Sequence, residues 1–335
     1  MESVCDAASL LSEDSTVDLE HLLGPALEAE ILKEETSELQ KKLLMKHVQG
    51  LLEVEGACGE EISAYIYSTS VDHGGNTEVS SGYGQLYRQL AEEAHLSDIT
   101  RLSSPVEAII STENEGVSIL IQGDEVPLHA RGAVCCLPLG CLQAGHLRFE
   151  PALPEMTQSR ISSLGVGTFE KICIEFEGSF GCDVSAVTPL PGDDDEFYAF
   201  RRFVNYSKRC EGRNVWLGYT AVGYASRMHE KRDEEVLTDA CKVFQLAFPE
   251  DEVHVRDFHL TRWLEDAFSL GSWAVEKPGC KAQNRVEPLL AAPSVFIAGE
   301  FVAGPYIGCA DGAWRSGALA AEMLALKLSA VGEAR

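Results

Sequence analysis

A glycine and a carboxylate follow a short apolar run near the end of this 335-residue chain. The run Val295–Ala298 has the composition of a buried strand, and Gly299 and Glu300 come directly after it. Glycine lets the backbone approach a ligand closely, and a carboxylate can accept hydrogen bonds from the hydroxyl groups of a bound sugar chain. An ordinary strand-end turn with an exposed acid would have the same pattern, so these residues alone leave the choice open.

A helix start follows soon afterwards. Cys309–Ala313 precedes or opens an Ala- and Leu-rich helix, which the sequence predicts over Gly312–Leu328. The first turn of a helix presents unpaired N–H groups and a partial positive charge, so it can stabilise an anion. The amide of Ala310 is the best candidate donor, although Asp311 could equally be a plain helix cap.

Lys171 and three aromatic residues complete the set of side chains suited to chemistry. Lys171 follows a glycine-rich turn and precedes an apolar strand predicted over Ile172–Phe176. Trp263, Phe268 and Trp273 lie close together in sequence, and a ring face attracts a cationic amine by about 0.5–2 kcal/mol. The alternatives are a lysine at an exposed strand edge and three rings packed in a core.

Composition excludes several classes of function. The formal net charge is -26, whereas a nucleic-acid surface needs clustered Lys and Arg, so no direct nucleic-acid binding is expected. The acidic balance permits a cationic substrate without identifying one. The nine histidines show neither HxxxH nor HxH spacing, so the sequence predicts no metal site.

The cysteines and the first residues indicate the compartment. The 11 cysteines are odd in number and form no CxxC pair, which favours a reducing environment. The first residues lack a basic region, and no run of about 18 apolar residues occurs, so we expect neither a secretory signal nor a membrane span. The predicted location is the cytoplasm, with the nucleus as the alternative.

Strand and helix patterns are mixed along the chain, which indicates an α/β or α+β architecture. Helical spacing recurs between residues 31 and 52, and again over Leu86–Ala94, Glu234–Phe248 and Gly312–Leu328. The predicted strands are Val106–Ser111, Val117–Gln122, Val126–His129, Ala133–Leu137, Ile172–Phe176, Phe197–Val204, Trp216–Thr220, Val253–Leu260 and Val295–Ala298.

Four segments in a fixed order carry a resemblance to a known family. They are Gly82–Leu86, then Val134–Leu142 with Phe149–Pro151, then Leu164–Lys171, and finally Arg262–Trp263, Phe268–Trp273, Phe296–Glu300 and Asp311–Gly317. Together they cover roughly residues 75–330 and resemble the flavin-dependent amine oxidases, the superfamily of monoamine oxidases, polyamine oxidases and lysine-specific histone demethylases. Each segment alone is a weak signal, and their order makes the combination specific.

The resemblance implies an α/β fold with two interleaved parts. A partial Rossmann-like FAD-binding domain, without its GxGxxG unit, would combine with an α+β substrate domain that contains a mixed sheet. The expected division is 1–80 for a helical part of the substrate domain, 82–142 for an FAD-domain segment, 143–285 for the substrate domain and 286–330 for the C-terminal FAD-domain segment.

The resemblance also implies roles for single residues. The predicted catalytic residues are Lys171, which would hold a water beside the flavin, and Trp273, which would form one wall of an aromatic cage where relatives usually have Tyr. Because Ser272 stands where covalently flavinylated relatives have Cys, the expected FAD is non-covalent. The predicted cofactor-binding residues are Val106, Trp263, Phe268, Ser272, Gly299, Glu300, Cys309, Ala310 and Gly312.

The implied reaction is oxidation of an amine C–N bond with O2, giving an imine or aldehyde and hydrogen peroxide, with a polyamine or N-substituted amine as substrate. The sequence contains no GxGxxG turn leading into a helix, the unit that binds the FAD pyrophosphate in this fold, so we expect an N-terminally truncated form. Two alternatives stay open: an inactive amine-oxidase-like scaffold without FAD, and a related L-amino-acid oxidase or desaturase. The sequence does not indicate the oligomeric state.

Overall fold

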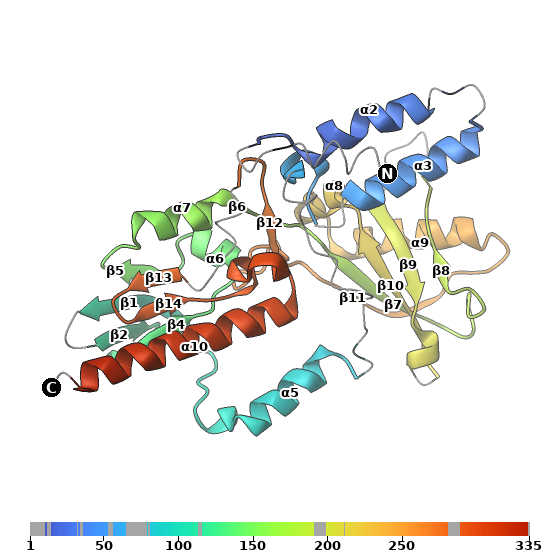
Figure 1. Cartoon of the computed structure of the whole chain (residues 1–335). Coiled ribbons are helices and arrows are strands. Elements are labelled where there is room, and N and C mark those ends of the chain that lie inside the picture. The colour runs from blue at the N-terminus through green and yellow to red at the C-terminus, as the bar shows by residue number, and fades with distance from the viewer. Residues whose placement is uncertain are drawn as a thin grey trace.

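The computed structural model describes most of the chain. The described residues are 15–31, 36–52, 56–64, 81–112, 116–190, 199–210, 212–280 and 289–333, with the single positions 11, 33 and 79. Two groups of strands lie at opposite sides of the molecule, each with helices packed beside it (Figure 1).

The first group of strands forms a four-stranded sheet of order β3-β2-β1-β5 and a three-stranded sheet of order β13-β14-β4. Parallel pairs occur in both sheets, between β1 and β5 and between β14 and β4, and the remaining pairs are antiparallel. The bounds are Val106–Thr112 (β1), Gly116–Ile121 (β2), Leu128–Ala130 (β3), Ala133–Cys135 (β4), Arg148–Glu150 (β5), Leu289–Ala292 (β13) and Val295–Ile297 (β14). Both sheets are therefore mixed.

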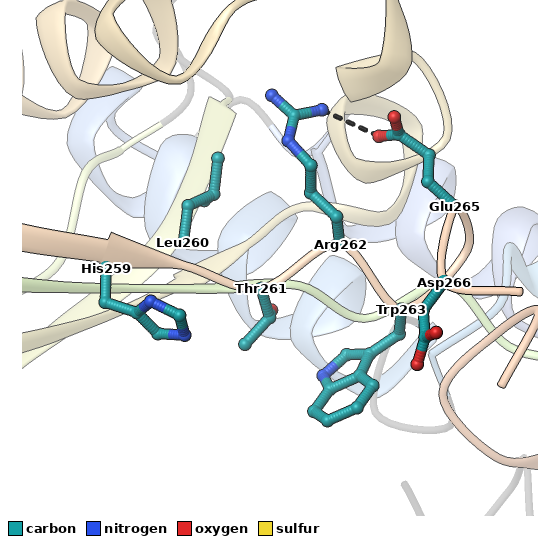
Figure 2. Close-up of a pocket in the computed structure, with 7 residues that line it drawn as sticks. All are labelled: His259, Leu260, Thr261, Arg262, Trp263, Glu265 and Asp266. Carbon is teal, nitrogen blue, oxygen red and sulfur yellow. Dashed lines mark hydrogen bonds and ion pairs between the residues drawn. The ribbon is translucent and has the colours of Figure 1, made fainter. Parts of the chain in front are cut away.

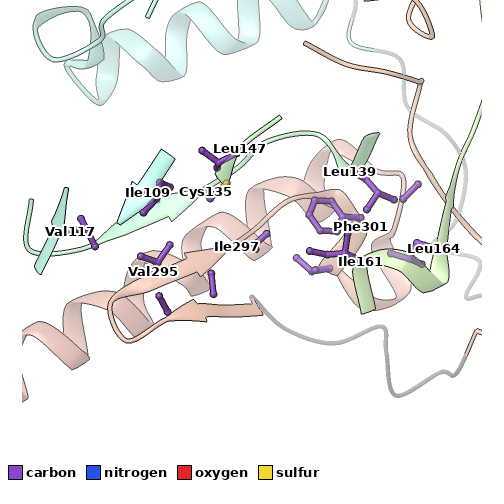
Figure 3. Close-up of a cluster of buried hydrophobic side chains, with 14 of the residues drawn as sticks. Ile109, Val117, Cys135, Leu139, Leu147, Ile161, Leu164, Val295, Ile297 and Phe301 are labelled. Carbon is purple, nitrogen blue, oxygen red and sulfur yellow. The ribbon is translucent and has the colours of Figure 1, made fainter. Parts of the chain in front are cut away.

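One apolar core joins these sheets to neighbouring helices, and Figure 3 shows its side chains. Three helices lie beside the first group: α6 (Leu139–Gln143), α7 (Glu155–Ser163) and α10 (Ala310–Glu333). The central strand β14 is buried on both faces, with Val295 and Ile297 at 0% exposure on one face and Phe296 at 4% on the other, which explains its uninterrupted apolar sequence.

The second group is a five-stranded sheet of order β11-β7-β10-β9-β8, in which every described pair is antiparallel. Its bounds are Lys171–Phe176 (β7), Ala186–Val187 (β8), Phe200–Asn205 (β9), Asn214–Thr220 (β10) and Val255–Leu260 (β11), with α9 (Asp233–Ala247) packed against it. Aromatic rings fill the core between α9 and the sheet, because Phe244 of the helix contacts Phe176, Phe203 and Trp216 at centroid distances of 4.6–5.2 Å.

The remaining elements connect or flank the two groups. Helices α2 (Leu19–Ile31) and α3 (Glu38–Leu52) share a small core with β12 (Ala274–Glu276), which pairs with β6 (Leu164–Val166). Helix α5 (Tyr83–Glu93) buries none of its residues. Across the described part of the chain, no helix is both long and apolar enough to cross a bilayer.

The predicted α/β class is confirmed, and the structure adds the location of the mixed pairing. Parallel strands occur in the first group, and the sheet of the predicted substrate domain is antiparallel. Residues 143–163, which the sequence grouped with the substrate domain, place β5 beside β1 and α7 against β13, so this segment packs with the first group. The division into domains stays a prediction.

The predicted elements recur with shifted ends. The predicted strand Ala133–Leu137 ends at Cys135, ahead of Pro138, whose missing N–H cannot continue a ladder. The final helix begins at Ala310, as the predicted helix start at Cys309–Ala313 requires. Residues 197–198 of the predicted strand Phe197–Val204 lie outside the described residues.

Candidate cofactor and amine site

Lys171 begins β7, an interior strand between β11 and β10, at the end that faces the loop carrying Trp263. Its amide donates to the Thr261 hydroxyl over 2.8 Å, and its carbonyl accepts from the Thr261 amide over 2.9 Å, so two backbone bonds fix its position. The half-buried side chain turns back over the preceding residues, and Nζ lies 5.9 Å from the centroid of the Phe169 ring. This lysine is held in place at both backbone groups.

Phe169 is the centre of an aromatic cluster that the sequence analysis missed. Its ring contacts Trp273 at a centroid distance of 5.1 Å and Tyr219 at 5.8 Å, and the Arg201 guanidinium lies 6.0 Å from its centroid. Tyr219 pairs with Lys171 across strands β10 and β7, which brings it to the same end of the sheet. Phe169 thus joins the two predicted catalytic residues, Lys171 and Trp273.

Trp273 continues this cluster to the start of α10. A Cβ placed on Gly308, two residues before the helix, would lie 3.4 Å from Cδ1 of Trp273, so the indole packs directly on that backbone. Gly308 has φ +73°, a conformation that glycine adopts without the strain an L side chain would bring. The contacts from Lys171 through Phe169 and Trp273 therefore lead to the amide end of α10.

Glu300 ties the same region together through its carboxylate. Oε1 accepts from the Ala274 amide over 3.1 Å and Oε2 accepts from the Gly308 amide over 2.7 Å. Burial raises the pKa of this carboxyl, and the two amides act against that rise. Glu300 therefore holds the strand that follows Trp273 against the turn before α10, a role the sequence did not predict, and its predicted contact with the FAD sugar chain stays a prediction.

The amide end of α10 is open. Residues 308–311, which include the predicted cofactor residues Cys309 and Ala310, are exposed. The Cys309 amide donates to the Tyr306 carbonyl over 3.1 Å. The first amides of a helix have no intrahelical acceptor, so this end is available to an anionic group. Gly312 is buried, and a Cβ there would clash with the Tyr306 carbonyl oxygen, so a close turn on the helix side explains this glycine.

Trp263 and Phe268 lie on the segment that follows β11. Trp263 is 42% exposed and Phe268 is 70% exposed, so neither ring is buried in a core. A cavity of about 390 Å³ is lined by His259, Leu260, Thr261, Arg262, Trp263, Glu265 and Asp266. Figure 2 shows the rings of His259 and Trp263 on the side opposite to Arg262 and Leu260, as an extended backbone requires.

Arg262 anchors that segment from its other side. Its guanidinium donates to Asp233 over 2.7 Å, to Glu265 over 2.7 Å, and to the carbonyls of Met228 and Lys231. Four acceptors occupy this side chain, so it fixes the loop that displays Trp263.

The surroundings of Ser272 bear on whether a polar cofactor could bind here. Its Oγ is buried and has no hydrogen-bond partner within the described residues, although a buried hydroxyl normally has one. The neighbouring Gly271 packs on Val166, and Gly140 of the Pro138–Leu142 segment packs on the carbonyl oxygens of Ser269 and Leu270, so this loop is tightly held. An unsatisfied hydroxyl, exposed rings and an open helix end fit a polar aromatic group such as FAD.

The two remaining predicted cofactor residues lie in the first group of strands. Gly299 donates its amide to Ser316 Oγ over 3.0 Å, and a Cβ there would lie 2.6 Å from the Phe301 ring, so this glycine makes room for a ring of its own chain. Val106 is half-buried at the start of β1 and packs on the core of that group. Glu300 therefore contacts the residue after Ser272 and Trp273, and Lys171 is linked to Trp273 through Phe169. Val106 instead packs in the core of the first group of strands.

Sequence reasoning missed Phe169, Glu170 and Thr261 as well as Gly140. Phe169 and Glu170 belong to the segment Leu164–Lys171 that carries part of the family resemblance. The sequence held a signal for Glu170, because a charged residue beside an apolar strand needs hydrogen-bonding partners when that strand is buried inside a sheet. In the described part of the chain, no group of three or more His, Cys, Asp or Glu side chains is arranged to hold a metal ion.

Comparison with known proteins gives related families and folds. Residues 31–325 match the family described as flavin containing amine oxidoreductase. Probable polyamine oxidase 4 of Arabidopsis thaliana is 29% identical over 252 residues, which is 74% of this chain and 48% of that protein. Human lysine-specific histone demethylase 2 is 26% identical over 307 residues, covering 86% of this chain and 36% of that protein.

The fold is similar to solved amine oxidases. Cyclohexylamine oxidase from Brevibacterium oxydans superposes with a TM-score of 0.73 at 19% identity, covering 98% of this chain and 74% of that one. Putrescine oxidase bound to putrescine gives a TM-score of 0.73 at 16% identity, covering 97% and 74%. The chain spans about half the length of the plant polyamine oxidases it matches. Because the family model matches most of its length, the chain belongs to the flavin containing amine oxidoreductase family.

Proposed function

We propose that this protein oxidises the C–N bond of an amine with non-covalently bound FAD and O2, giving an imine or aldehyde and hydrogen peroxide. The observation that carries the proposal is the continuous set of contacts from Lys171 through Phe169 and Trp273 to Gly308, just before α10. Family membership supports the cofactor and the class of reaction. Ser272 supports non-covalent binding, because a hydroxyl stands where covalently linked relatives have a thiol.

FAD, when bound, supplies the two-electron oxidation. The chain supplies the surroundings: the first-turn amides of the exposed residues 310 and 311 would stabilise negative charge on the group. Trp273 would present a ring face to a cationic amine, with Phe169 behind it fixing the plane of the indole. Lys171 would hold a water molecule at Nζ, since its backbone is fixed and only its side chain is free to reorient.

The substrate class we propose is a polyamine or an N-methylated lysine. The plant relatives are polyamine oxidases and the mammalian ones are lysine-specific histone demethylases, and the net charge of -26 favours attraction of cationic molecules. A dedicated arginine would be needed for an amino-acid carboxylate, and Arg262, one candidate, already contacts Asp233 and Glu265. This occupancy favours the amine over the amino acid.

The test is direct. The purified chain is incubated with FAD, and bound flavin is measured by absorbance after gel filtration and by the shift in melting temperature. Peroxide release is then followed with spermine, spermidine, a dimethyl-lysine peptide and single L-amino acids. We expect flavin retention and peroxide from an amine. A chain that stays colourless and unshifted overturns the proposal and favours the scaffold alternative, while peroxide from amino acids alone favours the L-amino-acid oxidase.

A further inference from the structure

Glu170 is a buried carboxylate that the proposed reaction does not use. Its residue is 2% exposed, and it lies directly before Lys171 in the chain. In the described part of the chain it forms no ion pair, and its described partners are neutral hydrogen-bond donors. Burying a charged group without a cation is costly, so it persists only where several donors converge on it.

Those donors come from one segment. Thr261 Oγ1 donates to Glu170 Oε2 over 2.6 Å, and the Leu264 amide donates to Oε1 over 3.2 Å. The Trp263 amide is also close enough to this carboxyl to act toward lowering its pKa. A single carboxylate therefore gathers donors from three of the four residues between 261 and 264, which turn the chain from β11 toward the site.

Thr261 links the Glu170 carboxylate to the backbone of Lys171. The hydroxyl that donates to Glu170 also accepts the Lys171 amide over 2.8 Å. Because the hydroxyl donates its hydrogen bond to the carboxylate, a lone pair on the same oxygen stays available to accept from the Lys171 amide. The backbone of Glu170 is fixed as well, through hydrogen bonds with Thr220 of 3.0–3.1 Å on the other side of β7.

We infer that Glu170 is a positioning residue that sets Lys171 and Trp263 at a fixed separation by binding Thr261 and the 263–264 amides at once. The inference rests on the proposed function, in which Lys171 holds a water molecule, and on the sequence prediction that Trp263 contacts the cofactor. An apolar residue of equal size would fill the space and leave a hydroxyl and two amides unpaired. Glu175 offers a contrast within β7, which begins one residue after Glu170: it is 7% exposed, but its partners are the side chains of Arg213 and Arg256.

The test uses two pairs of variants. Thr261→Val removes the hydroxyl and keeps the branched shape, and Thr261→Ser restores the hydroxyl. Glu170→Gln keeps one side-chain oxygen, which can accept from the amides of residues 263–264. Its side-chain nitrogen is a donor and cannot accept a hydrogen bond from the Thr261 hydroxyl. Glu175→Gln is the matched control, because it removes a buried charge from β7 without touching residues 261–264.

Two readouts are measured on each variant, and only the first requires bound FAD. In steady-state peroxide release, Thr261→Val and Glu170→Gln should lower kcat about 10- to 100-fold with KM changed less than about 3-fold, since misplaced groups cost rate more than binding. Thr261→Ser and Glu175→Gln should remain within about 3-fold of the parent. Equal losses in Thr261→Ser and Thr261→Val would overturn the inference.

The second readout does not require activity. Hydrogen exchange by mass spectrometry on peptides covering 168–175 and 258–268 should accelerate in Thr261→Val and Glu170→Gln, with exchange in α9 unchanged. Glu175→Gln should leave the 258–268 peptide as in the parent. If the parent neither binds FAD nor releases peroxide, the proposed function fails while this measurement still decides the role of Glu170. Unchanged exchange in both peptides refutes that role.

Discussion

The indole of Trp273 packs against the ring of Phe169, with centroids 5.1 Å apart and planes inclined by 43°. This contact joins the segment leading into β7 to the segment leading into β12. Because β7 belongs to the second group of strands and Glu300 links the residue after Trp273 to the turn before α10, one ring pair bridges the two halves of the site. The ring pair therefore connects the segment that carries Lys171 to the segment that reaches the start of α10.

Replacing Trp273 by Ala should weaken the use of cationic amines. Loss of a ring face worth about 0.5–2 kcal/mol corresponds to a fall of about 2- to 30-fold in kcat/KM. Trp273→Phe keeps a ring and serves as the control, with a smaller fall. The measurement is peroxide release across amine concentrations. An alanine variant with parental kcat/KM contradicts a cage wall at this position.

Lys171→Met should slow turnover without unfolding the protein. If its ammonium organises a water in the reaction, turnover falls about 100-fold or more, the scale of a lost proton-handling group. The melting temperature should change little, since the backbone bonds to Thr261 remain. Lys208→Met, at an exposed turn, controls for the lost charge. Equal activity of the two variants rules out the role of Lys171.

Two glycines of α10 should respond to alanine in opposite directions. At Gly312 the added Cβ would clash with the Tyr306 carbonyl and lie 2.8 Å from the Ala303 Cβ, so we expect a loss of about 1–3 kcal/mol in the free energy of unfolding. At Gly317 nothing lies within 4 Å, so better helix propensity should add about 0.5–1 kcal/mol. Urea denaturation measures both. Stabilisation by Gly312→Ala would contradict the tight turn.

Glu170 and Glu175 should give opposite pH dependence of stability. Burial raises the pKa of Glu170 above 4.5, so the folded state holds its proton longer, and its contribution is lost as pH rises from 4.5 through the raised value. The Arg213 hydrogen bond lowers the pKa of Glu175, so its contribution is present above 4.5 and is lost as pH falls through the lowered value.

Urea denaturation at several pH values checks these signs with Gln variants. From pH 4.5 upward, the free energy of unfolding of Glu170→Gln should rise relative to the parent. That of Glu175→Gln should be lowest relative to the parent near neutrality and approach it in acid. The same sign for both variants would contradict the two assignments.

The aromatic core of the second group should dominate its stability. Phe244 is fully buried and contacts four aromatic rings, so Phe244→Ala should cost about 3–5 kcal/mol. Leu246, on the same helix but 62% exposed, should cost less than about 1 kcal/mol when changed to Ala. Thermal unfolding followed by circular dichroism measures both changes. Similar losses would contradict the packing of α9.

The sequence determined the elements and their chemistry. Apolar runs such as Val295–Ile297 and the helical pattern from Gly312 specified buried strands and the final helix, because burial follows side-chain periodicity. The ordered segments around Gly82, Pro138, Lys171 and Trp273 specified the family, since each needs particular residue types at particular spacing.

Only the tertiary structure decided which residues serve the site. Glu300 and Glu170 have ordinary sequence surroundings, and their partners lie up to 26 and 94 positions away, at Ala274 and Leu264. The physical reason is that a buried carboxylate depends on the donors that reach it, and those donors lie in other segments of the chain that only the fold brings near. Long-range packing likewise placed Phe169 on Trp273, a contact that no local periodicity encodes.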